Sequence, residues 1–452
     1  MRSFPGNWTN VVHQLVEVEV NGRYEFMLTF QFSYYNLVLE GVYMVPRSVV
    51  LADLDEMATR DAVTSIILNI FFSGILMGGV IFVGYQTFKR LREIAQEQRR
   101  LLHVKVQDSL ACASELQYPI VLVCARDFLK LTDSEVRSCH EGVRLKGMLK
   151  FLDTDELLAK FKKSGGQIVF FSYEWQSWTK LGPNDVQLEW MRMSLSMYSE
   201  EYGVPLENLH VWLDILAIPQ CHVGMKTLAV NSLYVYAAST SAFIIIAPDC
   251  VHENTGNQSG IQSYKDRVWT RVEQVAMVSA NGTSKMFLSE GKSGLKPVDM
   301  DFLSRSLEVF QANMSCCRRN HEHQDYCDKE MVLLPMLGLW FRLLAAQRGI
   351  GASASIQEVY NIYMTDLDRY LPTYFDYTQA NGPTVRRPLF GNLTKEVKKI
   401  VDNLSDTELA DILKVQPEEQ AALGDDSGPK VERFLSDALK WPVPESIQTE
   451  EM

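Results

Sequence analysis

Polar and aromatic residues suited to ligand chemistry follow three apolar segments of this 452-residue chain, residues 167–173, 209–214 and 241–249. The first segment ends in Ser172-Tyr173 and is followed by Glu174-Trp175. The second ends in Asp214, shortly before Ile218-Pro219-Gln220, and the third ends in Pro248-Asp249. Parallel strands bring their carboxyl ends to one edge of a sheet, where loops converge on a crevice that binds ligands. The sequence therefore predicts a binding site at that edge.

A second group of reactive side chains lies further along the chain, in the spacing C-C-x3-H-x-H-x3-C. Its members are Cys316, Cys317, His321, His323 and Cys327. Cysteine and histidine are zinc ligands, but adjacent cysteines rarely share one metal and no paired CxxC motif frames the group. The alternatives are a zinc site and reduced, partly buried thiols. We expect the thiols, with no resident metal or cofactor.

The elements that position these residues alternate between strand-like and helical patterns, which is typical of an α/β fold. Two further strands are expected at residues 118–125 and 148–153, and another at 285–289. Helical patterns separate the strands at residues 155–163, 185–200, 227–238 and 264–278. We therefore expect an open, mostly parallel sheet flanked by helices.

The order of these motifs resembles the Toll/interleukin-1 receptor (TIR) fold and its fungal relative, the heterokaryon-incompatibility (HET) domain. The likeness covers residues 168–289 and rests on four motifs in order: SYEW, VWLDILAIPQ, FIIIAPD, and a helix in which a tryptophan precedes a glutamate. The HET domain shares a strand ending in Trp-Leu/Ile-Asp that is followed closely by Ile-x-Gln. The resemblance implies a flavodoxin-like arrangement of the sheet.

The resemblance also implies a chemistry, because enzymatic TIR domains cleave NAD between nicotinamide and ribose with a glutamate in a Trp-Cys-x-x-Glu motif. Here Trp269 and Glu273 have that spacing, with Thr270 in place of the cysteine. A fixed carboxylate near the ribose stabilises the oxocarbenium-like centre that forms as nicotinamide leaves. Glu273 is thus the candidate catalytic residue. Candidate contacts to NAD, a substrate rather than a cofactor, are Tyr173, Glu174, Trp175, Asp214 and Trp269.

Each of these assignments has a structural alternative. Glu273, which follows Arg267 and Arg271 on the same predicted helix, could lie on a solvated helix face and make weak ion pairs. Trp175 and Trp178 could stack on a nicotinamide or adenine ring, but the favoured role for them and for Trp212 is packing in a core or between domains. Asp214 could cap a helix instead of binding a hydroxyl group. Glu174 also replaces the basic residue that often follows the family's Ser-Tyr.

One segment is long and apolar enough to cross a bilayer as a helix, the uncharged stretch around residues 65–85. Acidic residues dominate before it (Asp53, Asp55, Glu56, Asp61) and basic residues after it (Lys89, Arg90, Arg92, Arg99, Arg100). The positive-inside rule then places the carboxyl side in the cytoplasm. All eight cysteines lie on that side, as expected of reduced thiols. The alternative is a buried helix of a soluble protein.

Net charge and missing motifs argue against several classes of protein. A net charge of −12 argues against a protein that binds nucleic acid by neutralising phosphates. The chain lacks GxxxxGK[ST], HExxH and GxSxG motifs, which carry P-loop, zinc-protease and hydrolase chemistry. The expected organisation is an outer segment (1–62) with a few strands, a transmembrane helix (63–88), a juxtamembrane helix (89–117), the α/β domain (118–300), a helical region (301–400) and an acidic tail (401–452).

These features predict a single-pass membrane protein that signals through self-association of its cytoplasmic domain and can hydrolyse NAD. The partners expected are the lipid bilayer, further copies of the chain and NAD, with no nucleic acid. The alternative is a non-catalytic scaffold that recruits other proteins through the same domain. An outer segment that senses a ligand is a third possibility.

Overall fold

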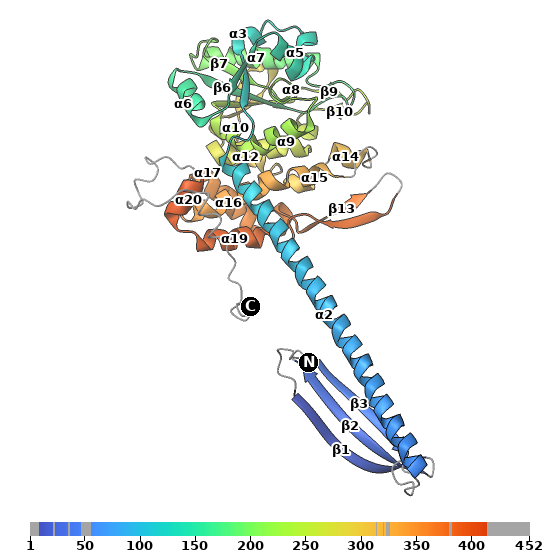
Figure 1. Cartoon of the computed structure of the whole chain (residues 1–452). Helices are drawn as coiled ribbons and strands as arrows, with labels where there is room; N and C mark the ends of the chain where they lie inside the picture. Colours follow the sequence, from blue (N-terminus) through green and yellow to red (C-terminus); the bar gives the residue numbers. More distant parts are fainter. Residues whose placement is uncertain are drawn as a thin grey trace. The chain divides into compact units, whose positions relative to one another are not determined.

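The computed structural model describes residues 9–20, 23–34, 37–46, 56–312, 314–319, 321, 326–378 and 382–413 (Figure 1). The chain divides into two compact units, Met1–Gln98 and Arg99–Met452. Most of the predicted acidic tail, from residue 414 onward, lies outside the described residues, as do parts of the predicted outer segment. Residues 401–413 are largely helical.

The first unit contains an antiparallel meander of three strands, β1 (Thr9–Val20), β2 (Arg23–Tyr34) and β3 (Leu37–Pro46). Val16 pairs with Met27, and Met27 pairs in turn with Met44. Alternating apolar and polar residues favour extended strands, because successive side chains point to opposite faces. The strands predicted before the apolar helix are therefore confirmed.

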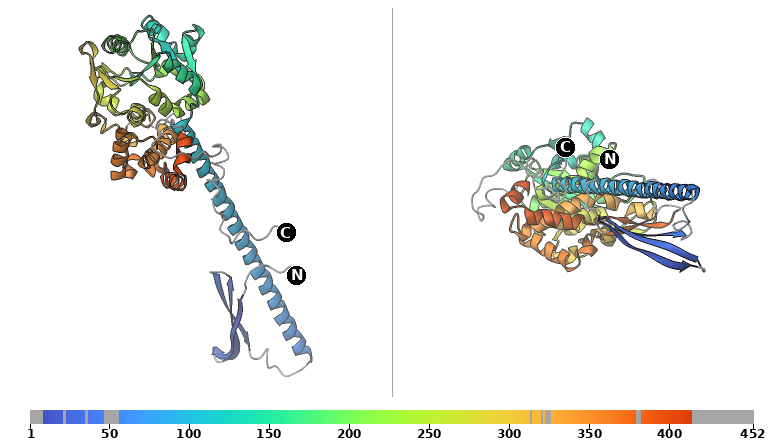
Figure 2. Two further views of the ribbon diagram at one scale, coloured as in Figure 1. Left: turned by 90° about the vertical axis from the view of Figure 1, so that its left-hand side faces the viewer. Right: turned by 60° about the horizontal axis from the view of Figure 1, so that its bottom comes forward.

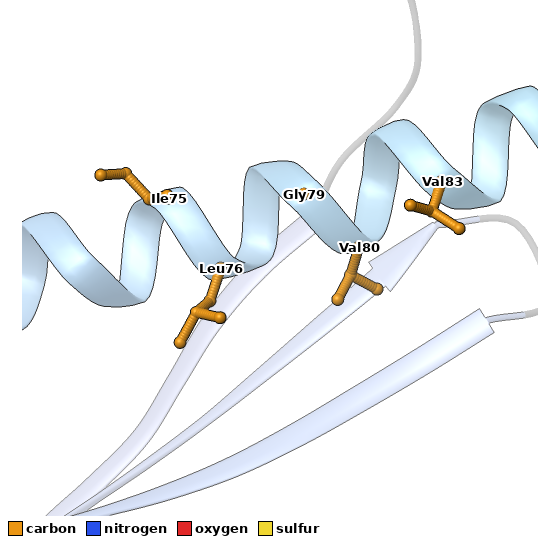
Figure 3. A pocket seen from close by; sticks show the side chains of 5 residues that line it. All are labelled: Ile75, Leu76, Gly79, Val80 and Val83. Atoms are coloured by element: carbon orange, nitrogen blue, oxygen red, sulfur yellow. The ribbon is translucent and has the colours of Figure 1, made fainter.

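A continuous helix of 59 residues, α2 (Glu56–Ser114), contains the candidate membrane span. From Val63 onward it is long and apolar enough to cross a bilayer, with a best window of mean hydropathy 2.4 and no residue of that window buried. Its apolar side chains are exposed, Leu76 to 72% and Ile70 to 68%. A shallow apolar hollow along the helix is lined by Ile75, Leu76, Gly79, Val80 and Val83 (Figure 3).

The carboxyl end of α2 is built into the second unit. Val106, Leu110 and Ala113 are buried in its hydrophobic core. A Cβ atom at Gly338 would lie 2.3 Å from the carbonyl oxygen of Ser109, so only glycine permits this close helix contact. The prediction that the juxtamembrane segment continues the apolar helix is confirmed, although the helix ends at Ser114.

The second unit, called here the α/β unit, is organised around a sheet of order β12-β11-β8-β6-β7-β4-β5. Its four central strands, β6 (Gln167–Tyr173), β7 (Leu209–Trp212), β8 (Ala242–Ile246) and β11 (Met286–Ser289), run parallel. Their carboxyl ends therefore share one edge of the sheet, called here the carboxyl edge. The predicted α/β class and mostly parallel sheet are confirmed.

The outer strands make the sheet mixed. β4 (Ile120–Cys124) pairs antiparallel with both β7 and β5 (Leu149–Leu152), and β12 (Leu295–Pro297) pairs antiparallel with β11. β4 thus runs against its neighbours, and its end at Cys124 lies away from the carboxyl edge.

Helices cover both faces of this sheet (Figures 1 and 2). α7 (Asp185–Glu201) packs on the face formed by Val169, Phe171 and Ile244, and the short helices α3 (Ala125–Phe128), α4 (Asp133–Val136), α5 (Cys139–Leu145) and α8 (Asp214–Ala217) lie in the same apolar cluster. The other face, with Phe170 and Phe243, packs against α10 (Leu233–Ser239) and α12 (Val268–Asn281). α6 (Asp155–Lys163) and α9 (Val223–Asn231) complete the connections between strands.

The carboxyl-terminal region forms a further helical layer against α10 and α12. Its centre is α16 (Leu333–Gln347), which is buried nearly all round and lies in the region predicted to be helical. The other elements are α13 (Met300–Leu303), α14 (Ser315–Arg318), α15 (Asp328–Met331), α17 (Ala354–Thr365), α18 (Leu367–Tyr370), α19 (Leu393–Asn403), α20 (Asp406–Leu413) and the hairpin β13 (Tyr374–Thr378) and β14 (Thr384–Pro388).

Candidate functional site

The strand order places a topological switch point between β6 and β8. After β6 the chain crosses by α7 to β7 on one side, and after β7 it returns by α10 to β8 on the other side of β6. The two crossovers lie on opposite faces of the sheet, so their loops diverge at the carboxyl edge. Ligands of open α/β sheets bind at this position.

Glu273 lies at this switch point. It is on α12, the helix that follows β8, and its Oε2 accepts a hydrogen bond of 2.5 Å from the hydroxyl of Ser172 on β6. Tyr264, on the short helix α11 (Ile261–Lys265), lies 2.7 Å from the same serine oxygen. Because a serine has one hydroxyl hydrogen, the tyrosine donates to Ser172 and Ser172 donates to Glu273.

Burial raises the pKa of Glu273 to about 8, with a contribution from the charge of Asp214 and an opposing one from the Ser172 hydrogen bond. The carboxyl group consequently exchanges its proton close to neutral pH, and pKa shifts of this size are concentrated at functional sites.

The sequence also allowed a solvated helix face on which Glu273 pairs with the neighbouring arginines. Arg271 is not on such a face. That side chain is only 2% exposed. Its guanidinium group donates to the carbonyl oxygens of Lys265 and Glu308, each at 2.6 Å, and to Asp266 at 3.3 Å. Arg271 therefore ties α12 to the helical layer.

A second cluster surrounds Asp214, at the start of α8 beyond β7. Its Oδ1 accepts hydrogen bonds from the Tyr173 hydroxyl at 2.7 Å and from the backbone amide of Ile215 at 2.6 Å. Its Oδ2 accepts from the indole nitrogen of Trp175 at 2.8 Å. The pKa of Asp214 is raised above its ordinary value, because the effect of burial outweighs the opposing effect of these hydrogen bonds. Asp214 thus binds both a hydroxyl group and a helical amide.

The other predicted site residues lie at the same edge in different environments. Glu174 is 6% exposed and accepts a hydrogen bond from the Ser263 hydroxyl, which fixes the turn before α11. Trp269 packs against the hydrophobic core at the start of α12. Trp212 is a core residue, stacked on Phe170 with ring centroids 4.0 Å apart, as one alternative predicted.

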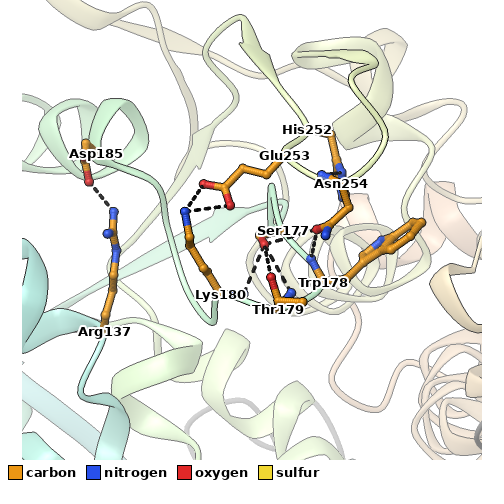
Figure 4. A network of polar contacts seen from close by, with 9 residues as sticks. All are labelled: Arg137, Ser177, Trp178, Thr179, Lys180, Asp185, His252, Glu253 and Asn254. Carbon is orange, nitrogen blue, oxygen red and sulfur yellow. Dashed lines mark hydrogen bonds and ion pairs between the residues drawn. The ribbon is translucent and has the colours of Figure 1, made fainter.

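The loop after β6 is held by a polar network (Figure 4). Asn254, between β9 (Cys250–Val251) and β10 (Gln258–Ser259), accepts hydrogen bonds from the Trp178 amide at 2.7 Å and the Ser177 hydroxyl at 3.3 Å. Lys180 pairs with Glu253 at 3.0 Å. Trp178 is 40% exposed and forms an edge contact with His252. The network fixes the position of Trp178 beside the carboxyl edge.

Two residues escaped the sequence prediction of this site. Tyr264 was expected only as part of a single helix over residues 264–278, but the helix breaks between Lys265 and Val268 and turns the tyrosine toward Ser172. Ser263, whose hydroxyl bonds Glu174, was not anticipated either. Neither contact has a local sequence signal, because the partners are about 90 residues apart.

The cysteine and histidine group is compact and distant in sequence from the carboxyl edge. The ligand atoms of Cys316, Cys317, His321 and Cys327 all lie within 4.8 Å of one another. His323 lies outside the described residues. These four side chains could hold a metal ion.

The chain matches no family model, no curated protein and no solved structure. The resemblance to TIR and HET domains therefore rests on the residues of this chain alone.

Proposed function

We propose that this protein is a single-span membrane protein whose cytoplasmic α/β unit resembles TIR and HET domains and hydrolyses NAD at the nicotinamide-ribose bond when copies of the chain assemble. One observation carries the proposal: Glu273 lies at the switch point of the sheet, bonded to Ser172, with a pKa of about 8. The parallel strand order β7-β6-β8-β11, or 2-1-3-4 in chain sequence, supports a flavodoxin-like fold.

In the proposed hydrolysis of NAD, a single carboxylate stabilises the charge that develops on the ribose. The bond between ribose C1′ and the nicotinamide nitrogen breaks with its electrons leaving on neutral nicotinamide, and the ribosyl group becomes oxocarbenium-like. Ionised Glu273 holds the ribose hydroxyls and stabilises the positive charge until water adds to C1′ and releases a proton. Ser172 and Tyr264 are positioning residues, because their hydrogen bonds fix the orientation of the carboxylate.

The membrane anchor supports the assembly step. Confinement of the α/β unit to a bilayer raises its local concentration, which favours weak self-association. The basic residues that follow the apolar part of α2 favour a cytoplasmic α/β unit.

A non-catalytic scaffold is the second candidate, and the environment of Asp214 favours it. Both carboxylate oxygens of Asp214 already accept hydrogen bonds from Tyr173, Trp175 and Ile215. A carboxylate engaged in this way stabilises a loop without contacting a ligand. Such a protein would recruit partners through the α/β unit and leave NAD intact.

Reconstitution at two surface densities separates the candidates. The full chain is incorporated into liposomes at high and low protein-to-lipid ratios, and nicotinamide release from NAD is measured by chromatography. The proposal predicts release that increases per molecule with density and is lost in Glu273→Ala. Glu189 on α7 is an exposed glutamate, so Glu189→Ala is the matched control and should retain activity. Absence of release from folded wild-type protein at both densities favours the scaffold.

A further inference from the structure

We propose that Cys316, Cys317, His321 and Cys327 bind one zinc ion as a structural site. Four protein ligands and no open position characterise structural rather than catalytic zinc. The site is formed by α14 and by two residues between α14 and α15, and no part of the proposed NAD chemistry depends on it.

Three of the six distances between the ligand atoms are close to those of tetrahedral coordination, and all six are within 4.8 Å. Zinc-sulfur bonds of ~2.3 Å and zinc-nitrogen bonds of ~2.0 Å place tetrahedral ligands about 3.5 to 3.8 Å apart. The Cys316 and Cys327 sulfurs are 3.8 Å apart, and those of Cys317 and Cys327 are 3.5 Å apart. The Cys317 sulfur lies 3.6 Å from Nε2 of His321. Three separate pairs thus have the spacing that one central ion imposes.

The histidine is oriented as a ligand by its surroundings. Its Nδ1 lies 2.7 Å from the carbonyl oxygen of Thr378 on β13, so Nδ1 carries the hydrogen and Nε2 directs a lone pair at the sulfurs. Metal-binding histidines commonly donate their second nitrogen to a backbone carbonyl in this manner. The imidazole also stacks on Tyr377, with ring centroids 4.3 Å apart.

The backbone supports the same assignment. His321 has a φ of 54°, a left-handed conformation that is unfavourable for a residue other than glycine. Such strain persists where the surrounding structure fixes it, often at a ligand site. The amide of Asp328 points to the Cys316 sulfur at 3.4 Å, a contact that stabilises thiolate. Cys316, His321 and Cys327 are each less than 10% exposed.

A disulfide explains the cluster less well. Sulfur atoms in a disulfide are ~2.05 Å apart, whereas all eight cysteines of the chain are free. A disulfide would also leave one of the three sulfurs and the oriented histidine without a role. The sequence-based preference for simple reduced thiols lacked the Thr378 contact, which points Nε2 at the sulfurs.

Zinc here would join three elements that are separated in sequence. Cys316 and Cys317 belong to α14, Cys327 precedes α15, and His321 is bonded to β13. The ion would therefore hold the β13–β14 hairpin and the start of the core helix α16 to the α14 segment.

Metal content and cobalt spectroscopy test the proposal on the full chain in detergent. The chain carries an affinity tag without histidines, is purified without chelator, and is analysed by elemental mass spectrometry. We expect one zinc per chain. Exchange for Co²⁺ should give a thiolate-to-metal charge-transfer band and the intense visible bands of tetrahedral cobalt.

Variants locate the site. Cys317→Ser is the principal one, because Cys317 is the least buried ligand, and it should weaken zinc binding by at least about 100-fold. His321→Gln should shift the visible cobalt bands. Cys221→Ser, a change at an exposed cysteine outside the cluster, should retain zinc and the wild-type spectrum.

Three results would overturn the site. One is reduced wild-type chain that binds neither zinc nor cobalt, and another is an intact mass showing a disulfide within the cluster. Equal metal retention by wild type and Cys317→Ser would place the metal elsewhere and also reject the assignment. Nicotinamide release is not among these readouts, so the two proposals fail independently.

Discussion

Replacement of Glu273 by glutamine should make the chain more stable relative to wild type as pH rises. Below pH 4.5 the carboxyl group is protonated in both folded and unfolded chains, and the substitution has no pH-dependent effect. Above that pH the unfolded chain ionises while the folded chain, with its pKa near 8, keeps the proton. Stability of the wild type therefore falls between about pH 4.5 and 8 and levels off above.

The size of this effect follows from the pKa difference. At 1.36 kcal/mol per pH unit, a change from the ordinary 4.5 to about 8 corresponds to about 4 to 5 kcal/mol in total, of which about 3 to 4 kcal/mol develops between pH 5 and pH 8. Glutamine keeps an oxygen that accepts the Ser172 hydrogen bond and has no charge to bury.

Thermal unfolding in nanodiscs measures the difference. The unfolding midpoint of Glu273→Gln minus that of wild type should increase from pH 5 to pH 8 by about 5 °C, since 1 kcal/mol shifts a unit of the length of Arg99–Met452 by about 1.5 °C. Glu189→Gln, a change at an exposed glutamate, should show no comparable trend. A difference that stays constant or declines with pH would refute the burial argument for Glu273.

Three further substitutions test other contacts. Arg271→Lys should reduce the free energy of unfolding by about 3 kcal/mol, because lysine cannot reproduce the guanidinium bonds to two carbonyl oxygens; unchanged thermal stability would contradict this role. Tyr173→Phe should reduce it by about 1 to 3 kcal/mol through loss of the bond to Asp214, and a stabilised variant would show that the bond is unimportant. Gly338→Val should separate the end of α2 from α16, so that Cys112, 1% exposed, reacts with maleimide faster than in wild type; continued protection of Cys112 would mean that the contact tolerates a side chain.

The parallel centre of the sheet could be predicted because its strands carry their own signal. Residues 168–171 and 242–246 are continuous apolar runs, and each is buried on both faces. The reversed direction of β4 has no such signal, because strand direction depends on pairing with β7. Local composition therefore identified the strands but not the mixed sheet.

Some residues of the candidate site could likewise be predicted from the sequence, whereas their tertiary contacts could not. Ser172, Asp214 and Glu273 could be proposed because each follows or lies near a recognisable strand or motif. The burial of Arg271 depends on Glu308, which belongs to another layer, and the orientation of His321 depends on Thr378, 57 residues away. Contacts of that range arise from tertiary packing, which short sequence patterns do not report.

The pH dependence of nicotinamide release by reconstituted chain at high surface density tests the proposed role of Glu273 most directly. Because the ionised carboxylate is the active form, the rate should rise between pH 6 and 9 with an apparent pKa near 8, and Glu273→Gln should release no nicotinamide at any pH. A flat profile, or release by the glutamine variant equal to that of wild type, would contradict catalysis by Glu273.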